Sequence, residues 1–221
     1  MDYRVTLTGT QPLLMHKDNL EWEDRIKSWR ENPENKKYSV RGDDRSPSWT
    51  WLSSLYSDDN VIAIPGDNIM AMVREGGALV PVPGGRNGKT FKAQTQSGIL
   101  LLDWYWPLLV EGKQIPVAPF FALEGNMHFD EHMHTARSNN FNLYIKRVKI
   151  GQSKHVRVRP MFRNWSVSGA VRVTDEQIDP NSLQAIFEMA GKLKGLCDWR
   201  PSSKTPGPYG TFTAEVVEVS P

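Results

Sequence analysis

The sequence predicts an α+β fold, a ferredoxin-like βαββαβ core with an antiparallel sheet and large inserted loops. Apolar and polar side chains alternate over residues 3–8 and 165–173, which is typical of half-buried strands. Apolar side chains over residues 22–29, 69–73 and 183–193 instead follow the helical spacing. With the inserts set aside, the order is strand, helix, strands, strand, helix, strand, which matches this plan.

With 221 residues, the chain is long enough to bury a core as one domain, residues 1–221. The inserts are expected at about residues 13–60, 81–97 and 122–160. The single cysteine, Cys197, excludes an internal disulfide and favours a reducing compartment. The chain opens on a strand instead of an apolar leader, and its apolar runs are too short for a bilayer. We therefore expect a cytoplasmic protein that makes no membrane contact.

The first half begins with a strand that ends near Gly9. A helix follows, in which Asn19 can cap the N-terminus while acidic residues come early and basic residues late. Residues 32–47 are rich in Asn, Lys, Asp and Pro and predict a mobile loop. Aromatic residues at 49–56 predict another short helix, and the next helix begins at Asp67 or the glycine before it.

A basic glycine-rich loop follows at residues 83–90. The spacing of its glycines does not match that of a phosphate-binding P-loop, so nucleotide hydrolysis is not expected. We interpret the loop as a flexible finger that could close over a bound nucleic-acid strand. Its cations that could reach phosphates are Arg86, Lys89 and Lys92.

The second half is predicted to contain strands at residues 99–106, 115–121, 165–173 and 211–219. Between the last two, Asp179 can act as N-cap of a helix, with Pro at the first helical position and Gly at the end. These elements complete the βαββαβ order.

A concentrated positive segment lies in the middle of a chain whose formal net charge is only +2. No acidic residue occurs between Glu131 and Asp175, whereas cations and aromatic rings are frequent there. Residues 154–159 alternate cations with valines, which predicts a strand or hairpin that displays guanidinium groups. Such a composition is typical of a groove for single-stranded nucleic acid, in which cations follow phosphates and rings stack on bases. The expected ligand residues here are Arg137, Phe141, Tyr144, Lys146, Arg147, Lys149, Lys154, Arg157, Arg159 and Arg163, with Phe162 as a further candidate for stacking.

The C-terminal segment carries two recognisable motifs. Residues 195–201 read Gly-Leu-Cys-Asp-Trp-Arg-Pro, and residues 209–212 read Tyr-Gly-Thr-Phe after a turn rich in Pro, Ser and Gly. They resemble the closing signature of the RAMP superfamily, in particular that of the repeating backbone subunits of CRISPR interference complexes. Without the family, the same residues predict a helix stop, with the Trp199 indole packed on the preceding helix.

The resemblance implies an RRM-like ferredoxin core that coats a guide RNA as a filament in antiviral defence. It implies single-stranded RNA as partner, with DNA as the alternative, together with copies of the chain assembled head to tail and other subunits of a ribonucleoprotein complex. Some backbone subunits cleave RNA with a loop aspartate, and Asp18 is the candidate by position. We expect no enzymatic activity, no cofactor and no metal.

Two other functions stay open. One is a single-strand annealing protein of phage or mobile-element origin that acts on DNA. The other is a metal-dependent ribonuclease that uses Asp18 or the loop of His128, His132 and His134, although this spacing matches no common zinc motif. A serine hydrolase is not expected, because the Gly-x-Ser-x-Gly turn does not occur.

Burial is expected to separate structural from functional side chains. Cys197 follows an apolar helix and is predicted to be a buried, unreactive thiol. The tryptophans are predicted to lie mainly in the core. Those that could instead be stacking platforms are Trp49, Trp51, Trp104 and Trp106.

Overall fold

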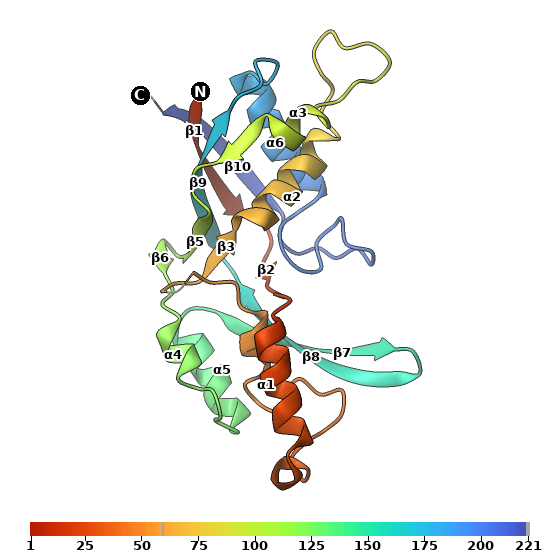
Figure 1. Cartoon of the computed structure of the whole chain (residues 1–221). Coiled ribbons are helices and arrows are strands. Elements are labelled where there is room, and N and C mark those ends of the chain that lie inside the picture. The colour runs from red at the N-terminus through yellow and green to blue at the C-terminus, as the bar shows by residue number, and fades with distance from the viewer. Residues whose placement is uncertain (59, 220–221) are drawn as a thin grey trace.

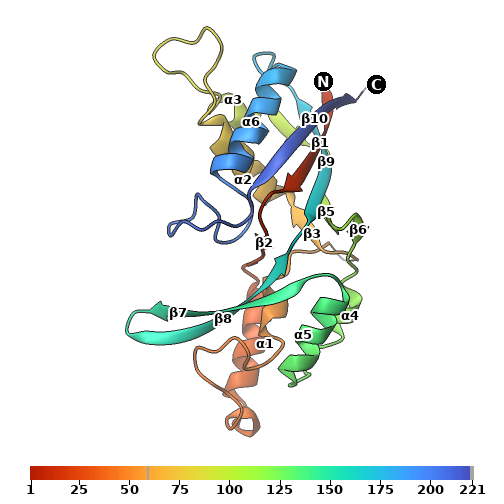
Figure 2. The ribbon, with the colours of Figure 1, turned by 180° about the vertical axis from the view of Figure 1, so that it is seen from behind.

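The computed structural model describes residues 1–58 and 60–219 and has a mixed α+β architecture with antiparallel sheets (Figure 1). The larger sheet has the strand order β10-β1-β9-β5-β3, with β4 paired to β9 and β6 paired to β5. Helices α2 and α6 cover one face of this sheet, and no helix covers its other face within the described residues (Figure 2). The bounds are β1 Asp2–Gly9, β3 Ala63–Pro65, β4 Ile99–Leu101, β5 Tyr105–Val110, β6 Lys113–Gln114, β9 Trp165–Val173, β10 Phe212–Val219, α2 Gly66–Gly77 and α6 Pro180–Leu193.

The second sheet lies beyond one end of the first and has the order β2-β8-β7. Strands β7 and β8 form a long hairpin that projects from the body of the molecule (Figure 1). Helices pack around the base of this hairpin. The bounds are β2 Leu13–Leu14, β7 Asn142–Ile150, β8 Ser153–Phe162, α1 Leu20–Glu31, α4 Ala118–Phe121 and α5 Phe129–Ser138, with the short helices η1 Pro33–Asn35, η2 Thr50–Ser54 and α3 Gln94–Ser97 elsewhere.

Local sequence signals explain the elements that were predicted. In β1 the alternate residues Tyr3, Val5 and Leu7 are buried, so this strand prediction is confirmed. The side chain of Asn19 accepts a hydrogen bond from the backbone N–H of Trp22 and caps α1. At α6, Asp179 Oδ1 accepts from the Ser182 N–H at 2.7 Å. This contact lowers the pKa of Asp179, because the hydrogen bond favours the ionised carboxylate.

A cap also covers the outer edge of the larger sheet. Strand β10 pairs with β1 on one side only. On its other side, the amide of Gln184 in α6 donates to the Ala214 carbonyl at 2.7 Å and accepts from the Val216 N–H at 2.9 Å. One side chain thus satisfies an exposed donor and an exposed acceptor of the edge strand.

Aromatic side chains form the core between the second sheet and helices α4 and α5. The ring of Phe141 stacks on Phe162 at a centroid distance of 4.9 Å and meets Phe120 edge-on at 5.1 Å. Trp51 packs against the same cluster and is fully buried. Of the four tryptophans named as alternative platforms, only Trp104 is exposed, at 59%.

The predicted strand at residues 115–121 is wrong. The segment contains the helical turn α4 instead, after an isolated bridge at Pro116. Proline has no N–H for a ladder but is tolerated in the first turn of a helix, where Pro119 lies. The two prolines therefore outweigh the apolar run that suggested a strand.

Two predicted loops contain more structure than their polar composition indicates. Residues 128–134 lie mostly in helix α5, where His132 and Ala136 face the core one helical turn apart. Residues 32–47 contain η1 and two buried polar side chains, Asp44 and Ser46. None of the helices in residues 1–58 and 60–219 combines the length and the apolar run that a bilayer crossing requires.

Candidate nucleic-acid interface

A groove with a volume of about 520 Å³ runs between the β7–β8 hairpin and the C-terminal loop of residues 198–205. We call it the hairpin groove. The register of the hairpin pairs Tyr144 with Arg159 and Lys146 with Arg157, so these four side chains share one face. The groove is lined by Leu14, His16, Tyr144, Lys146, Val148, Lys149, Arg157, Arg159, Asp198, Trp199, Ser203, Lys204 and Thr205.

The charge of the hairpin groove distinguishes it from the neighbouring pocket. Five Lys and Arg side chains line the groove against a single carboxylate, Asp198. The neighbouring pocket, of about 590 Å³, lies against α1 and shares His16, Arg157 and Arg159 with the groove, but its Lys and Arg side chains are matched by an equal number of Asp and Glu. The hairpin groove is therefore the more positive of the two sites.

A buried carboxylate holds two of the groove arginines in place. Asp44 accepts from Arg157 Nη1 at 2.8 Å and from Arg159 Nη1 at 3.2 Å, and also from the backbone N–H of Val158. Asp44 is 5% exposed. Arg159 has a second carboxylate partner, because its Nε lies 3.5 Å from Asp198 Oδ2. The row of guanidinium groups predicted from the sequence is thus largely neutralised within the protein.

His16 lies beside these arginines. Its Nε2 is 3.2 Å from Arg159 Nη2, an arginine donor, and its Nδ1 is 3.9 Å from Asp198 Oδ2. Partial burial and the positive charge of Arg159 lower the pKa of His16 below the ordinary histidine value. The imidazole is therefore neutral at pH 7 and can take up a proton when a polyanion is bound.

We expect the affinity for a single strand to rise as the pH falls below about 6.5, the ordinary histidine value. The protonated imidazole of His16 adds positive charge against bound phosphate. The free energy of unfolding changes in the opposite sense and falls as the pH falls. The pKa of His16 is lower in the folded than in the unfolded chain, so the unfolded chain takes up the proton first. Fluorescence anisotropy with an RNA oligonucleotide, measured between about pH 5.5 and 7.5, should give a smaller rise for His16→Gln than for the wild type. An equal rise in both would assign the effect to other histidines.

Aromatic rings form one wall of the groove. The ammonium of Lys146 lies 3.2 Å from the centroid of the Trp199 ring. Tyr209 packs against the same indole at 5.3 Å and against Tyr144 at 5.8 Å. A cation–π contact at an exposed site contributes about 0.5–1 kcal/mol, whereas a base stacked on an aromatic side chain contributes about 1–3 kcal/mol.

The structure separates the predicted ligand residues into groups. The hairpin carries seven of them, of which Arg147, Lys149 and Lys154 are exposed. Phe141 is not a surface residue: it is 1% exposed, so the prediction that it stacks on a base is wrong, and the same holds for Phe162. The seven on the hairpin are Tyr144, Lys146, Arg147, Lys149, Lys154, Arg157 and Arg159.

Arg137 and Arg163 lie apart from the hairpin groove. Together with Asn140 and Asn164 they line a small pocket of about 230 Å³ next to the turn after β5. Because neither arginine lines the hairpin groove, their inclusion in one channel with the hairpin cations is wrong.

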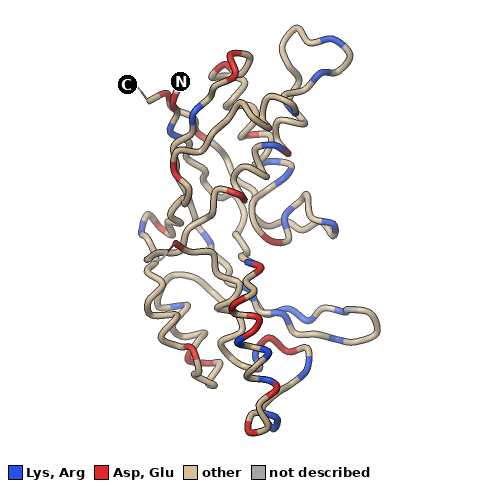
Figure 3. The backbone as a smooth tube through the Cα atoms, viewed as in Figure 1, with Lys and Arg blue, Asp and Glu red and all other residues tan. Residues whose placement is uncertain are grey.

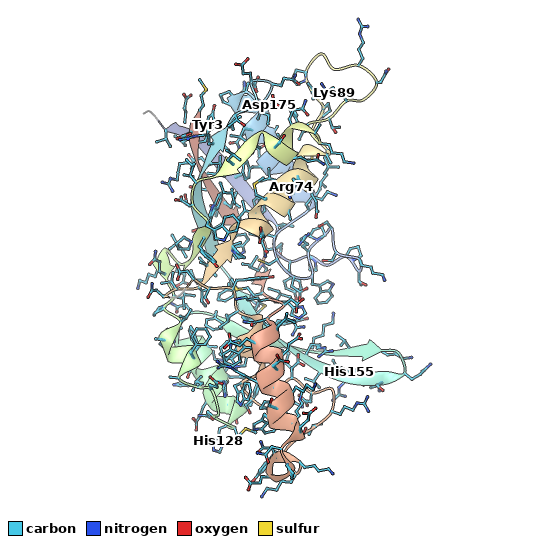
Figure 4. All side chains as sticks on the ribbon, viewed as in Figure 1. Tyr3, Arg74, Lys89, His128, His155 and Asp175 are labelled. Atoms are coloured by element: carbon cyan, nitrogen blue, oxygen red, sulfur yellow. The ribbon has the colours of Figure 1, made fainter. Side chains whose placement is uncertain are left out.

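The glycine-rich loop lies at the opposite end of the molecule from the hairpin. Figure 4 labels Lys89 on this loop and His155 on the hairpin, and Figure 3 shows cations on both the loop and the hairpin, which lie well apart. The prediction that Arg86, Lys89 and Lys92 close over the groove is therefore wrong. The composition of the loop shows that it is basic, but not where it lies relative to the hairpin.

We expect the triple substitution of Arg86, Lys89 and Lys92 to Ala to leave the affinity for a short oligonucleotide within about twofold of the wild type. Exposed charges beyond a Debye length of about 8–10 Å are largely screened at ordinary salt. Anisotropy with an oligomer too short to reach the loop checks this expectation. A loss as large as that caused by groove substitutions would contradict it.

One histidine of α5, His132, has a structural role. The Trp51 indole N–H donates to His132 Nδ1 at 3.1 Å, and the other ring nitrogen lies 2.9 Å from the Asn126 carbonyl. Burial lowers the pKa of His132 and keeps it neutral. Asp18 lines neither the groove nor the pocket beside it. Among residues 1–58 and 60–219, no group of three or more His, Cys, Asp or Glu is arranged to hold a metal ion.

Several groove residues were not predicted as ligand residues, and three of them carry an aromatic or basic side chain. Trp199 was interpreted as a helix-packing residue, and His16 and Lys204 lie in loops whose composition gave no signal. Cys197 agrees with its prediction: the thiol is buried, and burial raises its pKa to about 12. Arg200 binds the Cys197 carbonyl and Glu75 and so has a structural role.

Comparison with known proteins does not assign a family or a function to this chain. No model of a protein family matches the chain, and no curated protein matches it significantly in sequence. The hairpin groove is the site on which a functional interpretation has to rest.

Proposed function

We propose that this protein binds single-stranded nucleic acid, RNA before DNA, along the hairpin groove and without reading its sequence. The observation that carries the proposal is the composition of the groove, in which five cations against one carboxylate surround Trp199 and Tyr144. Cations suit a phosphate backbone, and aromatic rings accept any base on their faces. Neither kind of contact depends on base identity, which favours a binder of general specificity.

The topology of the larger sheet supports an RRM-like, ferredoxin-like core. With β5 as second strand, β10-β1-β9-β5 is the order 4-1-3-2 of a βαββαβ unit, with α2 before the second strand and α6 before the fourth. In this interpretation residues 1–221 are one domain, and α1, α5 and the hairpin belong to inserts. Together with the C-terminal motifs, this order supports a relationship with the RAMP superfamily.

We also propose that copies of the chain assemble head to tail on the strand, in the manner of CRISPR backbone subunits. The hairpin projects beyond the body of the molecule (Figure 1), and β7 is the outer strand of its sheet. A heterologous contact of this kind yields a filament instead of a closed dimer. The role would be that of a cytoplasmic ribonucleoprotein subunit without catalytic activity of its own.

The test is fluorescence anisotropy with matched single-stranded RNA, single-stranded DNA and duplex DNA over a salt series, with light scattering to follow particle size. We expect tight, steeply salt-dependent binding to a single strand, accompanied by growth in size. Absence of binding to all three polymers would overturn the proposal. Annealing of complementary DNA strands, or cleavage of RNA that a chelator abolishes, would favour one of the two alternative functions.

A further inference from the structure

The backbone of Trp199 has an uncommon conformation. Its φ is +47°, in the left-handed region that bulky residues rarely adopt. Gly207 lies so close to the Trp199 indole and carbonyl that a side chain at position 207 would collide with them. A strained conformation persists only where its surroundings fix it, and such residues concentrate at functional sites.

Trp199 also differs from the other tryptophans in its position, because it is the one tryptophan among the described residues that lines the hairpin groove. Trp51, Trp106 and Trp165 are buried in the core. Trp104 is exposed but does not line the groove. Trp199 is half-buried and forms part of the groove wall, so its strained backbone presents an indole to the site and not to the core.

The position over the indole is held by a group that can move. Lys146 reaches the ring from β7, and its ammonium occupies the space that a stacked base would take. Its cross-strand neighbour is Arg157. The side chain of Lys146 is flexible. When its ammonium leaves the indole, it remains beside the other cations of the groove, where a phosphate would lie.

We propose that Trp199 is a stacking platform for one base of the bound strand, and that Lys146 leaves the indole on binding and pairs with a phosphate. This inference rests on the proposed function and assigns its base contact to one residue. The ligand class is a nucleotide within a single strand, with any base. Tyr209 packs against the indole with a tilt of 35° and so restrains the platform.

Trp199→Leu should weaken binding of a short single strand by about five- to 150-fold, the range known for loss of one stacked base. The slope of affinity against salt should not change, because no phosphate contact is removed. Lys146→Ala should instead reduce the slope by about 0.7, the value for one phosphate on a single strand. The matched control is Trp104→Leu, which removes an exposed indole outside the groove and should bind as the wild type does.

A second readout covers the case in which Trp199→Leu does not fold. The tryptophan fluorescence of the wild type should be quenched when a single strand binds. This quenching should be absent in Trp199→Phe, which keeps an aromatic ring, and should be retained in Trp104→Phe. A strand of abasic units should bind Trp199→Leu and the wild type equally. If Trp199→Leu binds as the wild type while Lys204→Ala binds more weakly, the platform is wrong and the groove stands. If the wild type binds no single strand, the proposed function has failed as well.

Discussion

Replacing Arg157 and Arg159 together by Ala should weaken binding to single strands of every sequence alike. A hydrogen bond to a charged group contributes about 1.5–3 kcal/mol, so each arginine lost corresponds to roughly tenfold or more in affinity at low salt. The slope of affinity against salt should fall by about 0.7 for each phosphate contact removed. Anisotropy over a salt series, with several unrelated sequences, measures both quantities.

The structure dictates how this variant has to be built. Without its arginines, Asp44 would be a buried carboxylate without a cationic partner, and breaking a buried ion pair in this way costs about 3–5 kcal/mol of stability. The substitution is therefore made together with Asp44→Asn, whose amide oxygen can still accept from the Val158 N–H. The matched control replaces Arg137 and Arg163 by Ala and Glu111 by Gln, so that both variants lower the net charge by one, here outside the groove. Equal losses in both pairs would mean that net charge alone attracts the strand.

Phe141→Ala should destabilise the fold by about 3–5 kcal/mol, the usual cost of removing a large buried ring. The side chain is 1% exposed and stacks on Phe162 within the aromatic core. For a chain of this length, such a loss lowers the melting temperature by about 2–4 °C per kcal/mol. Urea denaturation followed by circular dichroism measures the change in the free energy of unfolding.

The same variant separates a core residue from a ligand residue. At a temperature where Phe141→Ala stays folded, its affinity for a single strand should equal that of the wild type. Tyr144→Ala, on the groove face of the hairpin, should behave in the reverse manner, with a small loss of stability and a measurable loss of affinity. Weakened binding by folded Phe141→Ala would contradict its assignment to the core.

Local signals in the sequence predicted the parts of the fold that depend on neighbours in the chain. Alternation in β1 and β9 and the caps of α1 and α6 belong to this class, because they need only residues within one element. The turn α4 was missed, since two prolines changed the meaning of an apolar run. Helix α5 was missed because few of its residues face the core, and charged residues and histidines dominate its composition.

The site was predicted less completely, because it depends on contacts between distant segments. The hairpin and its cations follow from the alternation in residues 154–159. The pairing of Asp44 with Arg157 joins positions 113 residues apart, and nothing in either segment indicates it. The approach of Trp199 to Lys146 is of the same kind. A single sequence specifies which side chains carry charge, but not which of them meet.

The amide of Gln184 on the outer edge of β10 bears on how copies of the chain can associate. An open edge strand invites another chain to pair with it and is a common origin of aggregation. With Ala214 and Val216 already bonded to Gln184, the middle of this edge has no free ladder for an incoming strand. Pairing of a second chain along β10 is thereby disfavoured, so growth of amyloid-like fibres from this edge of the larger sheet is disfavoured as well.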